Sequence, residues 1–88
     1  MLEVHALFSG RVQGVGFRFR CSKEAIKLGL TGTVQNLSNG KVELIVQGEK
    51  EKIESLLSFL KQIFPDSAVL EKKESNLNQK TYSSFTVI

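Results

Sequence analysis

The sequence feature that most constrains the fold is a hairpin signal at Asn39-Gly40. The runs on both sides of it, residues 31–37 and 41–47, have the composition of strands, so we expect two adjacent antiparallel strands. A three-residue loop, 38–40, would place Val34 on the same sheet face as Val42, Leu44 and Val46. A two-residue turn would place it on the opposite face. Burial of apolar side chains favours the longer loop.

A strand and a helix are expected before this hairpin. Apolar residues alternate with others over residues 2–8, which is the period of a strand with one buried face. A helix of about three turns follows from Arg18 or Phe19, and Gly29 has the position of a Schellman stop. Three residues of this segment share one helical face: Cys21, Ala25 and Leu28.

The clearest periodicity lies between Gly48 and Pro65, where apolar residues recur at helical spacing: Ile53, Leu56, Leu57, Leu60 and Phe64. Apolar segments at 69–70 and 82–88 indicate further strands, with a polar turn at 75–80 between them. The charged run 71–74 is typical of a solvated strand edge.

The predicted order is therefore βαββαβ, with a further division into strands left open near the C-terminus. This order is typical of an α+β, ferredoxin-like sandwich, in which two helices cover one face of a mainly antiparallel sheet. The 88 residues, 41% of them hydrophobic, suffice for one core, so we expect a single domain over residues 1–88. We expect a monomer, because no amphipathic stretch is left over.

Charge and composition exclude several functions. The formal net charge of +3 suits an anionic substrate, but the basic residues are scattered among acidic ones and no nucleic-acid partner is expected. No stretch is apolar enough to cross a bilayer and no signal peptide is visible, so we expect no membrane association and a cytoplasmic location. Cys21 and His5 are the only residues of their kinds, which excludes a disulfide and a zinc site of clustered cysteines and histidines. We expect a buried Cys21 and an exposed His5.

Residues 10–18 read Gly-Arg-Val-Gln-Gly-Val-Gly-Phe-Arg and precede the first expected helix. Glycines at 10, 14 and 16 allow successive backbone N–H groups to point at one anion, and Arg18 adds a planar cation at the positive end of the helix dipole. Phe19 stands where a dinucleotide-binding loop has its third glycine, and the Gly-Lys-Ser/Thr sequence that ends a P-loop motif is absent. The loop therefore predicts a phosphate site of another type.

The glycine loop and the segment Thr31-Gly-Thr-Val-Gln-Asn-Leu-Ser-Asn-Gly40 together resemble the acylphosphatase family, and the resemblance extends along almost the whole chain. It implies the ferredoxin-like fold and hydrolysis of acyl phosphates, with Arg18 binding the phosphate and Asn36 positioning the attacking water. Two departures are visible. Thr33 and Gln35 stand where many members carry tryptophan and arginine, and the turn 38–40 lacks the common proline.

This chemistry requires little beyond positioning and fixed charge, so neither a cofactor nor a metal is expected. The substrate is expected to be a small acyl phosphate, whose own phosphate oxygen can accept the proton of the water. The phosphate cradle is expected to comprise the N–H groups of Gln13, Gly14, Val15, Gly16 and Phe17 together with the Arg18 side chain.

Other interpretations stay open at this point. Taken alone, a strand-end residue such as Asn36 can equally well bond its own turn backbone. The chain could be a non-catalytic module that binds phosphate or carbamoyl phosphate, or a ferredoxin-like RNA-binding domain, although the strand 41–47 lacks the aromatic residues such domains use. We expect Phe17 and Phe19 to pack and fix the loop rather than to stack on a substrate.

Overall fold

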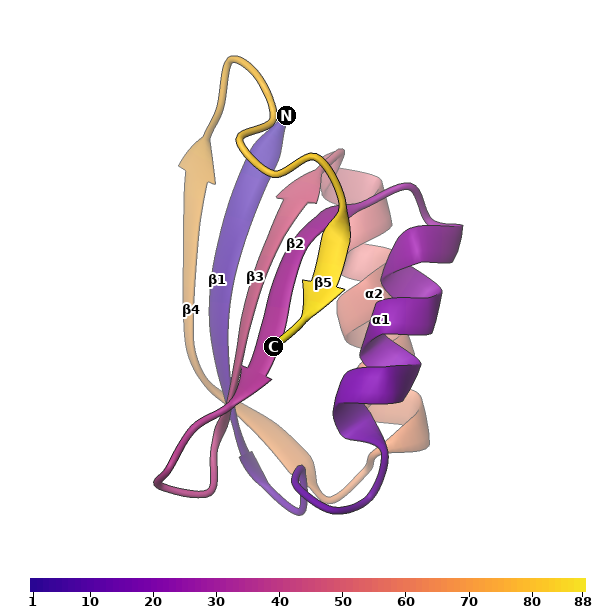
Figure 1. Ribbon diagram of the computed structural model, residues 1–88, viewed down its shortest axis with the longest axis vertical. Helices are drawn as coiled ribbons and strands as arrows, with labels where there is room; N and C mark the ends of the chain where they lie inside the picture. Colours follow the sequence, from indigo (N-terminus) through magenta and orange to yellow (C-terminus); the bar gives the residue numbers. More distant parts are fainter.

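The computed structural model describes all of residues 1–88. The elements are, in chain order, β1 (Leu2–Gly10), α1 (Phe17–Lys27), β2 (Thr31–Asn36), β3 (Val42–Gly48), α2 (Lys50–Ile63), β4 (Ser67–Asn76) and β5 (Phe85–Val87). The strands form one sheet in the order β4-β1-β3-β2-β5, antiparallel except for the β2–β5 pair, and both helices cover the same face (Figure 1). The predicted ferredoxin-like α+β fold is confirmed. The C-terminal part divides into two strands, which lie on opposite edges of the sheet.

The hairpin between β2 and β3 has the predicted three-residue loop. Leu37 N–H donates to the carbonyl of Lys41 at 2.8 Å, and Val34 pairs with Leu44 across the two strands. Both paired side chains are fully buried under the helices. The apolar pattern decides this register, since a shift by one residue would expose Val34.

The core lies between the sheet and the two helices. α2 contributes Ile53, Leu56 and Leu60, as predicted, whereas α1 contributes the smaller Cys21 and Ala25 next to Phe17. These side chains pack on buried residues of the sheet: Val4, Ala6, Phe8, Val34, Val42, Leu44, Val46 and Phe85. The buried position of Cys21 confirms the prediction that it is a core residue.

Helix α1 ends in the predicted Schellman motif. Leu30 N–H donates to the carbonyl of Ala25 at 2.9 Å, and Gly29 N–H donates to that of Ile26 at 3.0 Å. Gly29 has a φ of +75°, a backbone conformation that residues other than glycine rarely adopt. The chain therefore turns directly from α1 into β2.

One prediction for the C-terminal part is wrong. The polar turn was expected at 75–80, but β4 continues to Asn76 because that residue pairs with Leu2 of β1. Val69 and Leu70, whose apolar character indicated this strand, are exposed on the sheet edge, where a bulge interrupts the pairing with β1. The charged run 71–74 lies on the same exposed edge, as predicted.

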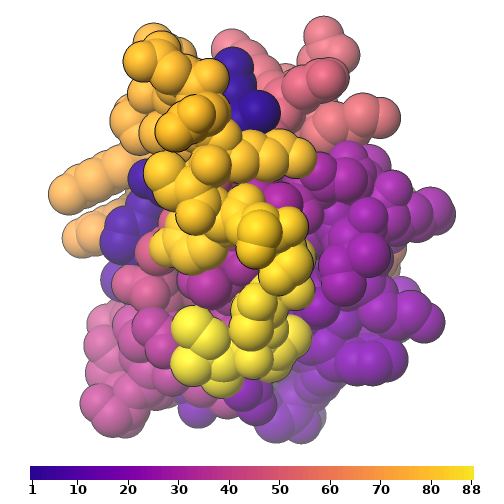
Figure 2. Space-filling view, turned by 45° about the horizontal axis from the view of Figure 1, so that its top comes forward, coloured from indigo at the N-terminus to yellow at the C-terminus, as the bar shows by residue number.

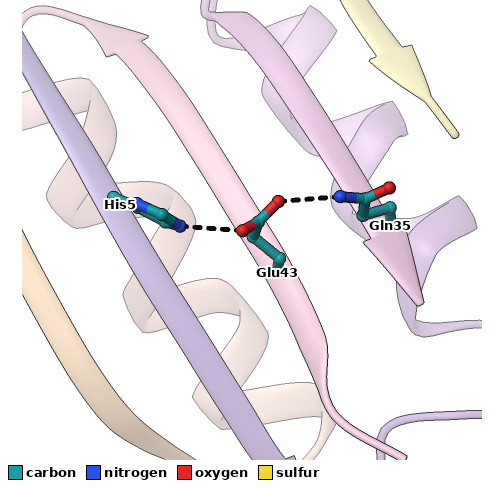
Figure 3. Close-up of polar contacts among 3 residues, drawn as sticks. All are labelled: His5, Gln35 and Glu43. Atoms are coloured by element: carbon teal, nitrogen blue, oxygen red, sulfur yellow. Dashed lines mark hydrogen bonds and ion pairs between the residues drawn. The ribbon is translucent and has the colours of Figure 1, made fainter. Parts of the chain in front are cut away.

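The sheet face opposite the helices carries a row of polar side chains, drawn in Figure 3. Glu43 lies between two partners: His5 Nε2 is 3.0 Å from its Oε2, and Gln35 Nε2 donates to its Oε1 at 2.8 Å. His5 is exposed, as predicted. Gln35, which together with Thr33 forms the first departure from the family pattern, thus takes part in an interaction on the open face of the sheet.

A buried glutamine attaches the C-terminal segment to the sheet. Gln47 at the end of β3 is fully buried, and its amide nitrogen donates to Glu3 at 2.8 Å and to the Thr81 hydroxyl at 2.6 Å. Its amide oxygen accepts the backbone N–H groups of Thr81 at 2.9 Å and Tyr82 at 3.2 Å. All polar atoms of this buried side chain are therefore paired. The segment held in this way leads into β5, which lies beside β2 and α1 (Figure 1).

Candidate active site

The glycine loop and the β2–β3 loop lie at the same end of the sheet, the lower end in Figure 1. Within the glycine loop, Gly14 and Gly16 have φ angles of +73° and +81°. A Cβ at either position would meet no atom within 4 Å, so glycine is required by the backbone conformation and not by crowding. Gly16 directly precedes α1, and no side chain caps that end of the helix.

A run of backbone N–H groups is left without acceptors at this helix start. The first hydrogen bond of α1 runs from Arg20 N–H to the carbonyl of Gly16 at 3.0 Å, and no N–H group from Gln13 to Phe19 donates to a backbone carbonyl. Such groups, together with the positive end of the helix dipole, form the usual anion-binding arrangement of proteins.

Phe17 fixes the start of α1. Its side chain is 1% exposed, and its ring centroid lies 5.1 Å from that of Phe8 on β1 and 5.0 Å from that of Phe64 after α2. The first residue of the helix is therefore held by both layers of the core, which limits the positions available to the neighbouring Arg18.

Arg18 is partly exposed and faces the C-terminal segment. Its Nη1 donates to the backbone oxygen of Ile88 at 2.9 Å, and Figure 2 shows the yellow C-terminal segment lying directly against the purple surface of α1. A guanidinium group has five N–H donors, so this contact leaves donors for an anion while it orients the group.

Gln13 connects the two loops of the site. Its Nε2 donates to the carbonyls of Leu37 and Lys41, each at 2.9 Å, and these residues flank the loop of the hairpin. Two hydrogen bonds from one partly buried side chain therefore set the position of the glycine loop relative to the end of β2. Sequence reasoning missed this role, since it considered only the backbone N–H of Gln13.

Asn36 lies at the end of β2 with an exposed side chain. The turn is bonded by another residue, since Lys41 N–H donates to Asn39 Oδ1 at 3.0 Å. None of the hydrogen bonds of the hairpin loop involves the side-chain amide of Asn36. The interpretation in which Asn36 merely bonds its own turn is therefore not what the structure shows.

These groups surround one cleft of about 380 Å³. Of the residues predicted for the site, Gly14, Gly16, Phe17, Arg18 and Asn36 line the cleft, whereas the side chains of Gln13 and Val15 do not. Three lining residues were not predicted: Val12, Phe19 and Val87.

The expectation that Phe19 packs against the protein and fixes the loop is wrong, because this residue is 61% exposed and lines the cleft. Residues two positions apart lie on nearly opposite sides of a helix. Since Phe17 points into the core, Phe19 cannot do so. The helical period after Phe17 could have predicted this orientation.

Few other groups in the chain offer reactive chemistry. Burial raises the pKa of the Cys21 thiol to about 12, so that it stays protonated and unreactive at neutral pH.

No group of three histidine, cysteine, aspartate or glutamate side chains is arranged to hold a metal ion. Neither helix has the length and hydropathy needed to cross a membrane.

Comparison with known proteins identifies the family and supports the fold. The family model described as Acylphosphatase matches residues 4–87. An acylphosphatase of Bordetella parapertussis is 40% identical over 86 residues, which cover 97% of this chain and 92% of that protein. The chain belongs to the acylphosphatase family. The predicted family, and with it the prediction of an acylphosphatase enzyme, is confirmed.

Solved structures agree with this assignment. The crystal structure of acylphosphatase from Bacillus subtilis superimposes with a TM-score of 0.84 at 31% identity, covering 100% of this chain and 99% of that one. The structure of HypF from T. kodakarensis contains a similar region, with a TM-score of 0.82 and 32% identity, but the match covers only 12% of that protein. The same fold therefore occurs in full-length relatives and as part of a much longer chain.

Proposed function

We propose that this chain hydrolyses the carboxyl-phosphate bond of small acyl phosphates in the cleft between the glycine loop and the hairpin, without a cofactor. The observation that carries the proposal is the run of N–H groups from Gln13 to Phe19 that have no backbone acceptor, beside Arg18 and across from Asn36. Membership of the acylphosphatase family supports the same reaction.

Arg18 and the backbone N–H groups hold the phosphoryl group. The guanidinium group donates two parallel hydrogen bonds to phosphate oxygens and neutralises the charge that develops on them in the transition state. The contact with Ile88 orients the side chain before the substrate arrives, so little reorganisation is required during the reaction.

Asn36 positions the attacking water. The water oxygen forms a bond to phosphorus while the bond between phosphorus and the bridging oxygen breaks, and the carboxylate leaves with the electron pair of that bond. A non-bridging phosphate oxygen accepts the proton of the water, since the cleft is lined by no histidine or carboxylate. The products are the carboxylate and inorganic phosphate.

The test is hydrolysis of benzoyl phosphate by the purified chain with EDTA present. Arg18→Ala and Asn36→Ala should each abolish most of the turnover, whereas Gln35→Ala, next to Asn36 but on the open face, should retain it. Turnover that needs an added metal ion, or that persists in both cleft variants, would contradict the mechanism.

The pH profile tests the proton transfer separately. His5 does not line the cleft and interacts with Glu43 on the open face, so it cannot serve as the base (Figure 3). We expect no change of kcat with pH near neutrality that depends on this residue. A limb of the profile that disappears in His5→Ala would show that a histidine takes part.

HypF, which contains a region similar to this chain, has also been solved in a phosphate- and nucleotide-bound form. This favours a second candidate function, a module that binds a phosphorylated compound without hydrolysing it. A titration of inorganic phosphate into the folded chain, read together with the hydrolysis assay, distinguishes the two. Phosphate binding without turnover of any acyl phosphate would support the module, whereas turnover supports the enzyme.

A further inference from the structure

We propose that Phe19 and Val87 form a subsite for the acyl group, so that the cleft favours acyl phosphates with an aromatic or bulky apolar acyl group over acetyl phosphate. The inference rests on the proposed function, because it assigns the part of the substrate beyond the phosphate to a part of the same cleft.

Exposed apolar surface in the cleft comes from these two side chains. Four of its lining residues are apolar, but Val12 and Phe17 are each only 1% exposed and belong to the core. Phe19 is 61% exposed and Val87 is 43% exposed. The cleft therefore combines a cationic and amide-rich part, suited to phosphate, with an apolar part that the phosphate does not need.

The position of this apolar surface matches the geometry of an acyl phosphate. Phe19 follows Arg18 in α1, and Val87 precedes Ile88 in the C-terminal segment, so the two residues adjoin the two ends of the Arg18–Ile88 hydrogen bond. In the substrate a single oxygen atom joins phosphorus to the acyl carbon. Because Arg18, Phe19 and Val87 line one cleft, an acyl group whose phosphate is held by Arg18 lies within reach of the two apolar side chains.

Phe19 has few partners within the folded chain. Its ring pairs with no other aromatic ring, and its cationic neighbour is Lys23, whose Nζ lies 5.5 Å from the ring centroid. An aromatic side chain can bury a large apolar area when a ligand covers it. Ile26 on the same helix is also 61% exposed but lies away from the cleft, which makes it a matched control.

The catalytic test compares kcat/KM for benzoyl phosphate and acetyl phosphate. Phe19→Ala should lower the benzoyl-to-acetyl ratio about tenfold, the range found when apolar groups are removed from substrate pockets, and Val87→Ala should lower it about threefold. Ile26→Ala should leave it unchanged. An equal loss for both substrates, or no loss for either, would overturn the subsite.

Binding of stable analogues separates this inference from the proposed function. Phenacylphosphonate and acetonylphosphonate replace the bridging oxygen of benzoyl and acetyl phosphate by a methylene group, so their Kd values can be measured calorimetrically without turnover. We expect the folded wild type to bind the aromatic analogue about tenfold more tightly and Phe19→Ala to lose that preference. This result in a protein that hydrolyses neither acyl phosphate would support the subsite and refute the proposed hydrolysis. Equal Kd values for the two analogues in the wild type would refute the subsite.

Discussion

The two helices lie side by side on the same sheet face, but their first turns differ. Helix α2 has an acidic residue, Glu51, in its first turn, where a negative charge interacts favourably with the helix dipole. The first turn of each helix carries two cations, Lys50 and Lys52 in α2 and Arg18 and Arg20 in α1, but α1 has no acidic residue to offset them. Neither helix start has a side-chain cap.

The difference agrees with the proposed roles, in which the start of α1 binds the ligand and the start of α2 serves folding alone. A cation in the first turn disfavours an isolated helix but favours an anion that binds to the same N–H groups. Beyond Phe17, α1 buries only the small Cys21 and Ala25, whereas α2 buries Ile53, Leu56 and Leu60 along its length. The two cations of α1 have no acidic residue beside them in the first turn, and such a departure from the rules of helix stability is expected at a functional site.

The sharpest test of this contrast is Arg18→Ala, read for activity and stability together. We expect kcat/KM for benzoyl phosphate to fall by about 10³-fold or more, in the range of arginines that stabilise phosphoryl transfer. The free energy of unfolding should stay constant or rise by about 0.3–1 kcal/mol, because an unfavourable charge is removed from the helix start. Chemical denaturation provides the second measurement. A large loss of stability would mean that the Ile88 contact matters for folding.

Arg18→Lys refines the same test. Lysine keeps the charge but not the planar pair of donors, so it should recover little of the lost activity. Activity close to that of the wild type would show that charge alone is sufficient at this position.

A core substitution in α2 should lower stability and leave the activity of the folded protein nearly unchanged, the reverse of what is expected for Arg18→Ala. Leu56 is fully buried in the core, so Leu56→Ala should lower the free energy of unfolding by about 2–5 kcal/mol. The kcat/KM of the folded fraction should remain near that of the wild type, because α2 does not line the cleft. Ile26→Ala in α1 removes an exposed side chain and should change stability by less than about 0.5 kcal/mol. A selective loss of kcat in Leu56→Ala at full folding would contradict the separation of roles.

Gln13 tests how the start of α1 is held against the hairpin. Gln13→Ala removes both hydrogen bonds to the Leu37 and Lys41 carbonyls, and kcat should fall about tenfold, equivalent to the loss of about 1–1.5 kcal/mol. Gln13→Glu has nearly the same shape but cannot donate these bonds, so it should lose as much. Wild-type activity in Gln13→Glu would show that packing, and not hydrogen bonding, positions the loop.

Elements governed by local pattern were predictable from the sequence. The hairpin loop, the stop of α1 at Gly29 and the buried face of α2 each depend on residues close together in the chain, where periodicity and turn chemistry decide the outcome. The glycine loop was recognisable for the same reason. Its φ angles at Gly14 and Gly16 are a local property of the backbone.

Contacts between distant segments could not be predicted in this way. The buried amide of Gln47 bonds Glu3 and Thr81, and the Gln13 side chain reaches across to the hairpin, yet nothing in a single sequence identifies these partners. The length of β4 likewise depends on the pairing of Asn76 with Leu2. The cleft acquires its apolar wall only when β5 brings Val87 beside α1.

The smallest effect is expected from a substitution that makes the start of α1 resemble that of α2. Phe19→Glu introduces the missing acidic residue into the first turn, and Phe19→Gln removes the same ring without a charge. Relative to Phe19→Gln, the glutamate should stabilise the fold by about 0.3–1 kcal/mol, or raise Tm by about 1–8 °C, because it interacts with the helix dipole. It should also weaken phosphate binding by like-charge repulsion close to Arg18. Both changes should shrink as salt is added, since they arise from exposed charges. A glutamate that stabilised the fold without weakening phosphate binding would show that the anion binds away from this helix start, and the contrast between the two helices would then have no functional meaning.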